Sequence, residues 1–157
     1  MELTDYFSSD DGSLPEIEVR FLSGDGVAEG LTYLFALGAR DASVGDTCIW
    51  MRDSNENRPF EGPNDANLVI AGTAEAFHLV LTNIDCTDSP IPELGVFVLP
   101  DQLVLDYRMG PEWGPNEIHA LLVVLSRLRD LGGHVSATSW WGADGNQTLS
   151  VALDQLS

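Results

Sequence analysis

The segment that most constrains the fold is Gly95 to Gly133, GVFVLPDQLVLDYRMGPEWGPNEIHALLVVLSRLRDLGG. Apolar runs at 96–99 and 103–107 lie on either side of Pro100-Asp101-Gln102, which predicts two strands that bend or pair at the proline. After Gly114 the apolar period changes from that of a strand to that of a helix, and one continuous stripe is formed. The stripe consists of Ile118, Leu121, Leu122, Leu125 and Leu128.

Both ends of this predicted helix carry the expected signals. Pro115 suits the first helical position, and Glu117 places a negative charge at the positive N-terminal end. Gly132 and Gly133 supply the stop. We therefore expect a helix over Pro115–Leu131 that packs its stripe against a sheet.

The other segments predict the strands of that sheet. Alternating or short apolar runs indicate strands over 14–23, 48–52, 67–72, 76–84, 134–141 and 147–156. Residues 27–39 fit both a helical and a strand period, and we favour the strand because Gly30 weakens a helix. Asp144-Gly145 is a hairpin signal between the last two strands, and the polar segment Asp53–Asp65 is expected to be an exposed loop.

These elements predict an α+β fold, a mainly antiparallel twisted sheet packed against one long helix in the C-terminal half. At 157 residues, and without an internal repeat or a charged linker, the chain is expected to form a single domain over 1–157. Residues 1–13 are acidic and polar and predict a loose N-terminal arm, which Tyr6 and Phe7 could pin to the body.

The charge balance is strongly one-sided. The chain has 25 Asp and Glu against 7 basic residues, all of them arginine, and a formal net charge of −18. Such a chain repels nucleic acid and anionic lipid, whose binding depends on Lys and Arg, and attracts basic protein partners. No apolar run approaches the ~18 residues needed to cross a bilayer, and the N-terminus lacks the pattern of a secretory signal, so a cytoplasmic protein is expected.

Signatures of catalysis, cofactor binding and metal binding are missing from the sequence. There is no GxSxG or phosphate-binding loop, and the three histidines are scattered singly. Cys48 and Cys86 lack CxxC spacing and are interpreted as reduced, mostly buried thiols. His78, inside a predicted strand, is interpreted as structural. We therefore expect no cofactor, no metal and no enzymatic activity.

The four tryptophans admit two interpretations. In the first, Trp113 staples the entrance of the helix and one of Trp140 and Trp141 fills the core. In the second, an exposed tryptophan beside acidic residues anchors a partner, since aromatic residues dominate interface energetics. Combining the second interpretation with the acidic loop gives the candidate partner-binding residues Asp53, Glu56, Glu61, Asp65, Glu112, Trp113 and Trp141.

Within the opening segment, Leu105–Leu128 reads LDYRMGPEWGPNEIHALLVVLSRL, a strand, a Gly/Trp-Gly-Pro break and a helix. This unit, in a small and strongly acidic chain, resembles the immunity proteins that bacteria make against polymorphic or contact-dependent toxins. The resemblance implies an antitoxin that blocks a basic nuclease or similar toxin by occupying its active-site surface.

Two alternatives belong to other functional classes. An acidic secretion chaperone or adaptor would hold a client protein as a dimer and would carry a large apolar patch. A small enzyme would use an unrecognised site around His78 and Cys86. The sequence leaves the oligomeric state open.

Overall fold

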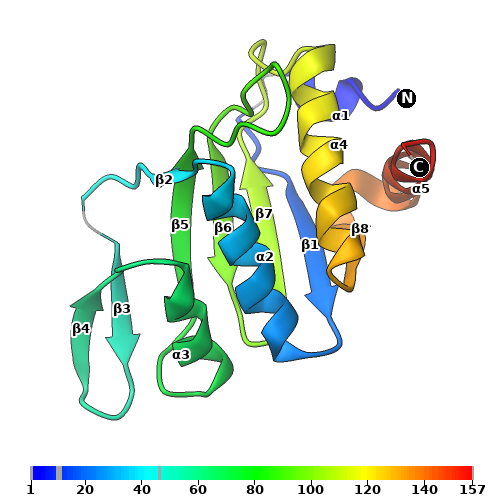
Figure 1. The fold of residues 1–157 in the computed structure, drawn as a ribbon. Coiled ribbons are helices and arrows are strands. Elements are labelled where there is room, and N and C mark those ends of the chain that lie inside the picture. Colours follow the sequence, from blue (N-terminus) through cyan, green and yellow to red (C-terminus); the bar gives the residue numbers. More distant parts are fainter. Residues whose placement is uncertain (1, 10–11, 46, 157) are drawn as a thin grey trace.

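The computed structural model describes residues 2–9, 12–45 and 47–156, which form a six-stranded antiparallel sheet of order β2-β5-β6-β7-β1-β8 with helices packed on it, and a separate two-stranded sheet β3-β4 (Figure 1). The α+β fold with a long helix in the C-terminal half is confirmed. The strands are β1 (Glu16–Phe21), β2 (Arg40–Asp41), β3 (Cys48–Met51), β4 (Glu56–Pro59), β5 (Phe77–Thr82), β6 (Leu94–Val98), β7 (Gln102–Tyr107) and β8 (Gly133–Ala137). The helices are α1 (Asp5–Ser8), α2 (Gly24–Ala36), α3 (Ala66–Ile70), α4 (Pro115–Asp130) and α5 (Gly142–Asp154), with short 3₁₀ turns η1 (Pro63–Asp65) and η2 (Ser139–Trp141).

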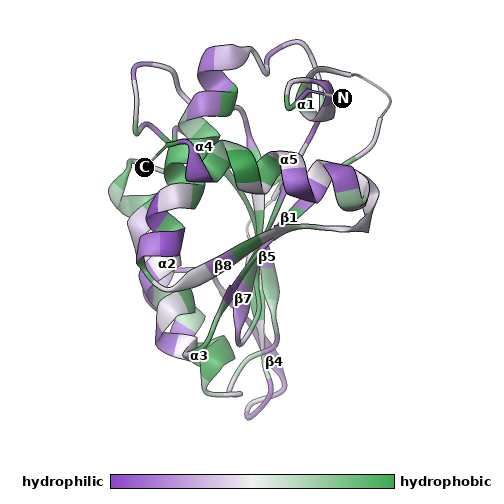
Figure 2. Ribbon diagram, turned by 90° about the vertical axis from the view of Figure 1, so that its right-hand side faces the viewer, coloured by the Kyte–Doolittle hydropathy of each residue, from purple (hydrophilic) through white to green (hydrophobic). Residues whose placement is uncertain are grey.

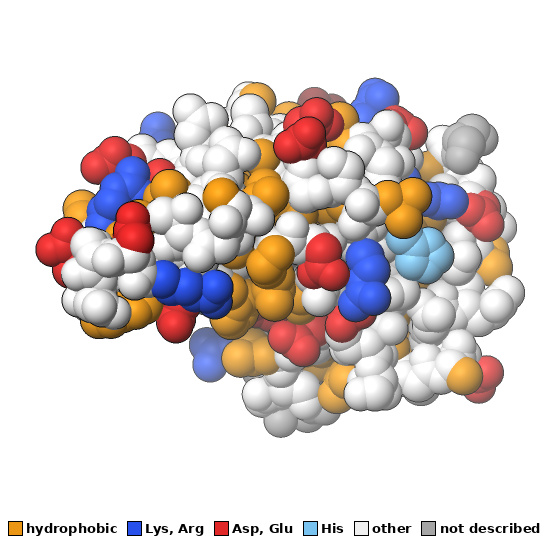
Figure 3. Space-filling model, turned by 90° about the horizontal axis from the view of Figure 1, so that it is seen from below, with side chains coloured by type: hydrophobic (Ala, Val, Ile, Leu, Met, Phe, Trp, Pro, Cys, Tyr) orange, Lys and Arg blue, Asp and Glu red, His pale blue; other side chains and the backbone are white. Residues whose placement is uncertain are grey.

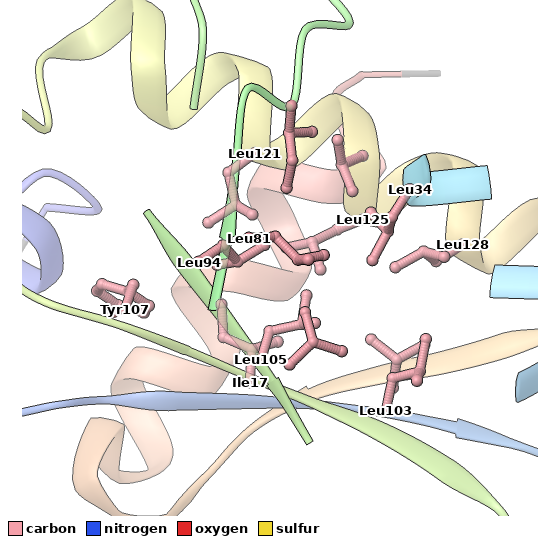
Figure 4. Packing of buried hydrophobic residues seen from close by; sticks show 14 of the residues in the cluster. Ile17, Leu34, Leu81, Leu94, Leu103, Leu105, Tyr107, Leu121, Leu125 and Leu128 are labelled. Carbon is pink, nitrogen blue, oxygen red and sulfur yellow. The ribbon is translucent and has the colours of Figure 1, made fainter. Parts of the chain in front are cut away.

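The predicted helix is α4, and it packs on the sheet as its stripe requires. Leu121, Leu125 and Leu128 point toward the side chains of the central strands, among them Ile17 of β1 and Leu105 of β7 (Figure 4). Each of these leucines is fully buried, which stabilises the fold by about 1.5–3 kcal/mol per side chain. The predicted strands at 96–99 and 103–107 are also confirmed, as the hairpin β6–β7.

The prediction of a strand at 27–39 is wrong, because this segment belongs to helix α2. Val27, Leu31 and Leu34 are buried on one helical stripe, and the Ser23 hydroxyl accepts a hydrogen bond from the Asp25 N–H at 3.3 Å. Gly30, which argued against a helix, is a point of close approach: a Cβ there would lie 3.0 Å from Leu103 Cδ1. The glycine weakens the isolated helix but lets α2 pack tightly on β7.

Two further strand predictions are wrong for a related reason. Residues 67–72 contain α3, and residues 147–156 lie largely in α5, whose first turn contains the Asp144-Gly145 pair that predicted a hairpin. In α5 the buried positions are Gly145, Leu149 and Leu153, four residues apart. A spacing of four satisfies both the helical and the strand period, so the apolar pattern alone does not separate them.

The remaining differences lie in the polar segments. The predicted loop Asp53–Asp65 contains strand β4 and the turn η1, and β4 pairs with β3 as a hairpin that projects from the main sheet (Figure 1). The Trp140–Trp141 pair lies in the turn η2 and not in a strand.

The described part of the predicted N-terminal arm is not loose. Residues 5–8 form α1, and Tyr6 and Phe7 are buried in the core. The Tyr107 hydroxyl donates a hydrogen bond to the Tyr6 carbonyl at 2.9 Å, and the rings of Phe7 and Tyr107 stack with centroids 4.6 Å apart. The Phe7 ring and the Tyr6 carbonyl thus hold the segment to Tyr107 of β7. Residues 1, 10 and 11 of the predicted arm lie outside the described residues.

Candidate functional site

The candidate residues predicted from the sequence do not converge on one surface. Asp53 and Glu56 are exposed at the tip of the β3–β4 hairpin, at the bottom of the molecule in Figure 1, whereas the loop that carries Glu112 lies at the top, before α4. Seen from below, acidic and basic side chains are interspersed with apolar ones (Figure 3). This side of the molecule therefore does not form one continuous acidic patch.

Asp65 is a structural residue. Its side chain is only 7% exposed, and it accepts hydrogen bonds from Arg58 Nη2 at 2.9 Å and from the Glu61 N–H at 2.7 Å. The hydrogen bond to Asp65 raises the pKa of Arg58, which also pairs with Glu61 at 3.2 Å. Asp65 thus ties the segment after β4 to Arg58 on β4, and of the two carboxylates Glu61 alone faces solvent.

Trp113 and Trp141 are core residues, 2% and 3% exposed, so neither side chain is available to a partner. Trp113 Nε1 donates to the Arg108 carbonyl at 2.9 Å, and Trp141 stacks on Tyr6 with ring centroids 4.6 Å apart. The first interpretation of the tryptophans describes the structure: Trp113 closes the helix entrance and one of the adjacent pair fills the core. The exposed member of that pair is Trp140.

Glu112 remains exposed and lines a cleft of about 520 Å³ beside the N-terminus of α4. We call this the Glu112 cleft; it is lined by Pro90, Ile91, Pro92, Glu93, Arg108, Glu112 and Glu117. The lining thus contains three acidic residues and one arginine. Glu117 is held by the Gly114 N–H, which donates to its Oε1 at 3.1 Å, and burial of Trp113 fixes the loop beside Glu112. The sequence did not indicate that Glu93 and Glu117 line the same cleft as Glu112.

A second hollow, of about 310 Å³, adjoins the Glu112 cleft and shares Glu93 and Arg108 with it. The rest of its lining comes from Leu14, His78, Val80, Gly95, Asp106 and Tyr107. In this hollow His78 Nε2 lies 2.7 Å from Asp106 Oδ2. Because a carboxylate accepts and does not donate, the proton of this bond belongs to the histidine.

Gly95 makes this pair possible. His78 is on β5 and Asp106 on β7, and β6 runs between them, with Gly95 directly opposite Asp106 in the register. A Cβ at position 95 would overlap the Asp106 carboxylate. The absence of a side chain lets the carboxylate lie over β6 and reach His78. A glycine inside a strand is the sequence signal that would have pointed to this close approach.

Cys86 does not belong to the same site as His78. Its thiol donates to the Ala120 carbonyl of α4 at 3.4 Å, so it lies among the helices, whereas His78 projects from the other face of the sheet beside Asp106. Burial raises the pKa of Cys86, which keeps it a thiol. The enzyme hypothesis built on His78 and Cys86 together is therefore not supported by the geometry. Within residues 2–9, 12–45 and 47–156, no group of three or more His, Cys, Asp or Glu side chains is placed to hold a metal ion.

One face of the main sheet is left open by the helices. Figure 2 shows the strands nearly edge-on, with α2 and α3 on one side and no helix against the lower part of the other side. We call the outward-pointing side the open face. Its side chains come from Glu16, Glu18, Arg20, Arg40, His78, Val80, Thr82, Phe97, Gln102, Val104, Asp106, His134 and Ser136. Phe97 is 39% exposed on β6, in the middle of this face.

A groove of about 540 Å³ lies on the opposite layer of the molecule, between α2 and α4. Ala28, Tyr33 and Ala36 of α2 face Leu131 across it, so its lining is mostly apolar. The only ion pair that the described residues place at its rim joins Arg127 and Asp130 at 3.6 Å, and both side chains are largely exposed. Such a pair contributes little to stability.

Comparison with known proteins returned no relative: no protein-family model matches the chain, and neither curated proteins nor solved structures gave a match. Among the described residues there is no helix with the length and apolar character needed to span a membrane.

Proposed function

We propose that this chain is an acidic protein-binding domain that neutralises a basic protein partner by covering its functional surface, in the manner of an immunity protein that blocks a toxin. The observation that carries the proposal is the Glu112 cleft. There Glu93, Glu112 and Glu117 line one cleft together with a single arginine, Arg108, in a chain of net charge −18.

The cleft has the properties that favour a charged partner. Its carboxylates attract Lys and Arg side chains, and the field of the whole chain accelerates encounter with a basic protein at low salt. The cleft is also preorganised, because α4 and the buried Trp113 hold the loop that carries Glu112. Preorganisation lowers the entropy cost of binding.

The test uses the purified product of the gene that neighbours this one in its source genome. We expect a complex whose Kd rises by at least about tenfold between about 50 mM and about 300 mM NaCl, since screening weakens exposed charge interactions. Co-expression is expected to rescue a host from toxicity of that product. Absence of a complex, or a Kd insensitive to salt, would rule out the proposal.

Glu112→Gln removes one charge of the cleft without changing its shape. We expect it to weaken the complex, chiefly through slower association. Glu75→Gln is the matched control, because Glu75 is also exposed but lies between α3 and β5, away from the cleft.

A second candidate is an acidic adaptor that holds a client protein, and the apolar groove between α2 and α4 favours it. This function predicts a dimer on a sizing column and a client whose binding depends on the groove. Ala36→Glu places a charge in the groove and should abolish client binding while leaving a complex at the Glu112 cleft unchanged.

A further inference from the structure

We propose that the open face of the main sheet is the docking surface for the basic protein partner, with Phe97 as its apolar anchor. This inference rests on the proposed function and assigns the larger part of the interface to the sheet. The Glu112 cleft then forms one end of the contact.

The open face carries an apolar strip where a solvated strand face would ordinarily be polar. Phe97 on β6 is directly opposite Val104 on β7 and diagonal to Val80 on β5, so three neighbouring strands each contribute one apolar side chain. Phe97 is 39% exposed, and its ring lies beside that of His78, with centroids 5.9 Å apart. An exposed aromatic side chain at the centre of a flat surface is typical of an interface anchor.

Acidic side chains flank this strip. Glu16 and Glu18 project from β1 and Asp106 from β7, against the two arginines at the described positions of the open face, Arg20 on β1 and Arg40 on β2. The Glu112 cleft continues the same surface, because the hollow that holds Asp106 shares Glu93 and Arg108 with the cleft. Together the two regions present six carboxylates, from Glu16, Glu18, Glu93, Asp106, Glu112 and Glu117, against the three arginines Arg20, Arg40 and Arg108.

The charges of the open face and the Glu112 cleft favour a basic protein over a second copy of the chain as the partner that binds there. A second copy of the chain would bring a surface of the same sign and is repelled, and the net charge of −18 adds to that repulsion. A basic protein with an apolar patch surrounded by Lys and Arg fits both the anchor and its acidic surroundings. The hydrogen-bonded strands form a rigid platform, so ordering this surface costs little on binding.

The test compares two open-face variants with two controls, using the purified product of the neighbouring gene as the probe. Phe97→Ser removes the anchor, and Glu18→Arg reverses a charge on β1, directly opposite Val104 of the apolar strip. Val151→Ser is the apolar control, since Val151 is 42% exposed on α5, and Glu29→Arg is the charge control on α2, in the helical layer. We expect Kd to rise at least about tenfold for each open-face variant and to change less than about twofold for each control.

Hydrogen exchange of the complex gives a second readout that needs no substitution. Amides in residues 16–21, 94–98 and 102–107 are paired in the free protein, so the expected change is slower exchange at the frayed ends of these strands and in residues 99–101. Protection confined to the β3–β4 hairpin or to the groove between α2 and α4 would contradict the proposal.

The outcomes separate this inference from the proposed function. If wild-type protein binds with salt dependence but both open-face variants bind equally well, the open face is not the interface and the proposed function stands. If the controls weaken binding as much as the open-face variants, attraction is spread over the whole chain and no docking face exists. If wild-type protein does not bind at all, both proposals fall.

Discussion

His78 Nε2 lies 2.7 Å from Asp106 Oδ2 even though strand β6 separates the strands that carry them. The bond crosses β6 above Gly95, the one residue of β6 whose lack of a side chain leaves room for the Asp106 carboxylate. The pair therefore depends on three residues: His78 and Asp106 form the hydrogen bond, and Gly95 leaves the space for it. Because the pair lies on the open face, its integrity also reports on the shape of that face.

Substitution of Gly95 by alanine is expected to break this pair without unfolding the protein. The new Cβ displaces the Asp106 side chain, whose end is free to move. Alanine gains about 0.5–1 kcal/mol over glycine in a strand, which offsets the ~0.5–1.5 kcal/mol that the lost hydrogen bond contributes. The measurement is the NMR signal of the His78 Nε2 proton, expected to be lost in Gly95→Ala. Asp106→Asn is the control, since its amide oxygen still accepts the bond; a signal that persists in Gly95→Ala would show that the pair does not need the gap.

Sequence periodicity predicted the elements in which one period is unambiguous. The stripe of α4 runs over three turns and is bounded by Pro115 and Gly132, and the β6–β7 hairpin is marked by Pro100; both are confirmed. The segments that became α2 and α5 carry apolar residues four apart, a spacing common to both periods. Tertiary packing decided between them, through contacts such as that of Gly30 with Leu103, which a local pattern does not contain.

The helical assignment of α5 makes a prediction that the strand assignment would reverse. Leu149 is 1% exposed and Val151 is 42% exposed, because two residues rotate about half a turn around a helix. Leu149→Ala is expected to lower the free energy of unfolding by about 2–5 kcal/mol, and Val151→Ala by less than about 0.5 kcal/mol. Denaturant unfolding of the two variants measures both values. Equal losses would indicate that Leu149 and Val151 share one face, as they would in a strand.

The candidate site was less predictable than the fold. Composition identified the excess of acidic residues, and Glu112 was named among the candidates, but burial separates residues that look alike in the sequence. Asp65 and Glu61 are both acids of one polar segment, yet the Asp65 side chain is 7% exposed and hydrogen-bonded, while the Glu61 side chain is 67% exposed. The open face was missed because its members come from β1, β2, β5, β6, β7 and β8, which only the sheet order brings together.

The difference in burial between Asp65 and Glu61 is expected to appear in the free energy of unfolding of their alanine variants. Asp65→Ala leaves the Glu61 N–H without its acceptor and is expected to lower the free energy of unfolding by about 1–3 kcal/mol. Glu61→Ala removes an exposed ion pair with Arg58 and is expected to change the free energy of unfolding by less than about 0.5 kcal/mol. Thermal or urea unfolding of both variants provides the comparison. Similar small effects for the two would mean that Asp65 is not needed to hold the segment after β4.

Tyr107 is expected to make the fold sensitive to alkali. Burial raises the pKa of its phenol well above the ordinary value of 10.0, so the folded protein keeps the hydroxyl that donates to the Tyr6 carbonyl. Below pH about 10 the phenol is neutral in both states and this stabilisation is fully present. Above that pH the unfolded chain loses the proton while the folded chain retains it. Stability then falls by up to about 1.4 kcal/mol per pH unit.

Tyr107→Phe tests this assignment. At pH 8 the variant is expected to be less stable by about 1–2 kcal/mol, because the Tyr6 carbonyl loses its donor. Between pH 9.5 and pH 11 its free energy of unfolding should decline less steeply than that of the wild type. Some decline remains in the variant, since burial also raises the pKa of Tyr33 and of Cys86. Urea unfolding followed across this range measures both slopes, and parallel curves for the two proteins would show that Tyr107 is not the group that alkali titrates on unfolding.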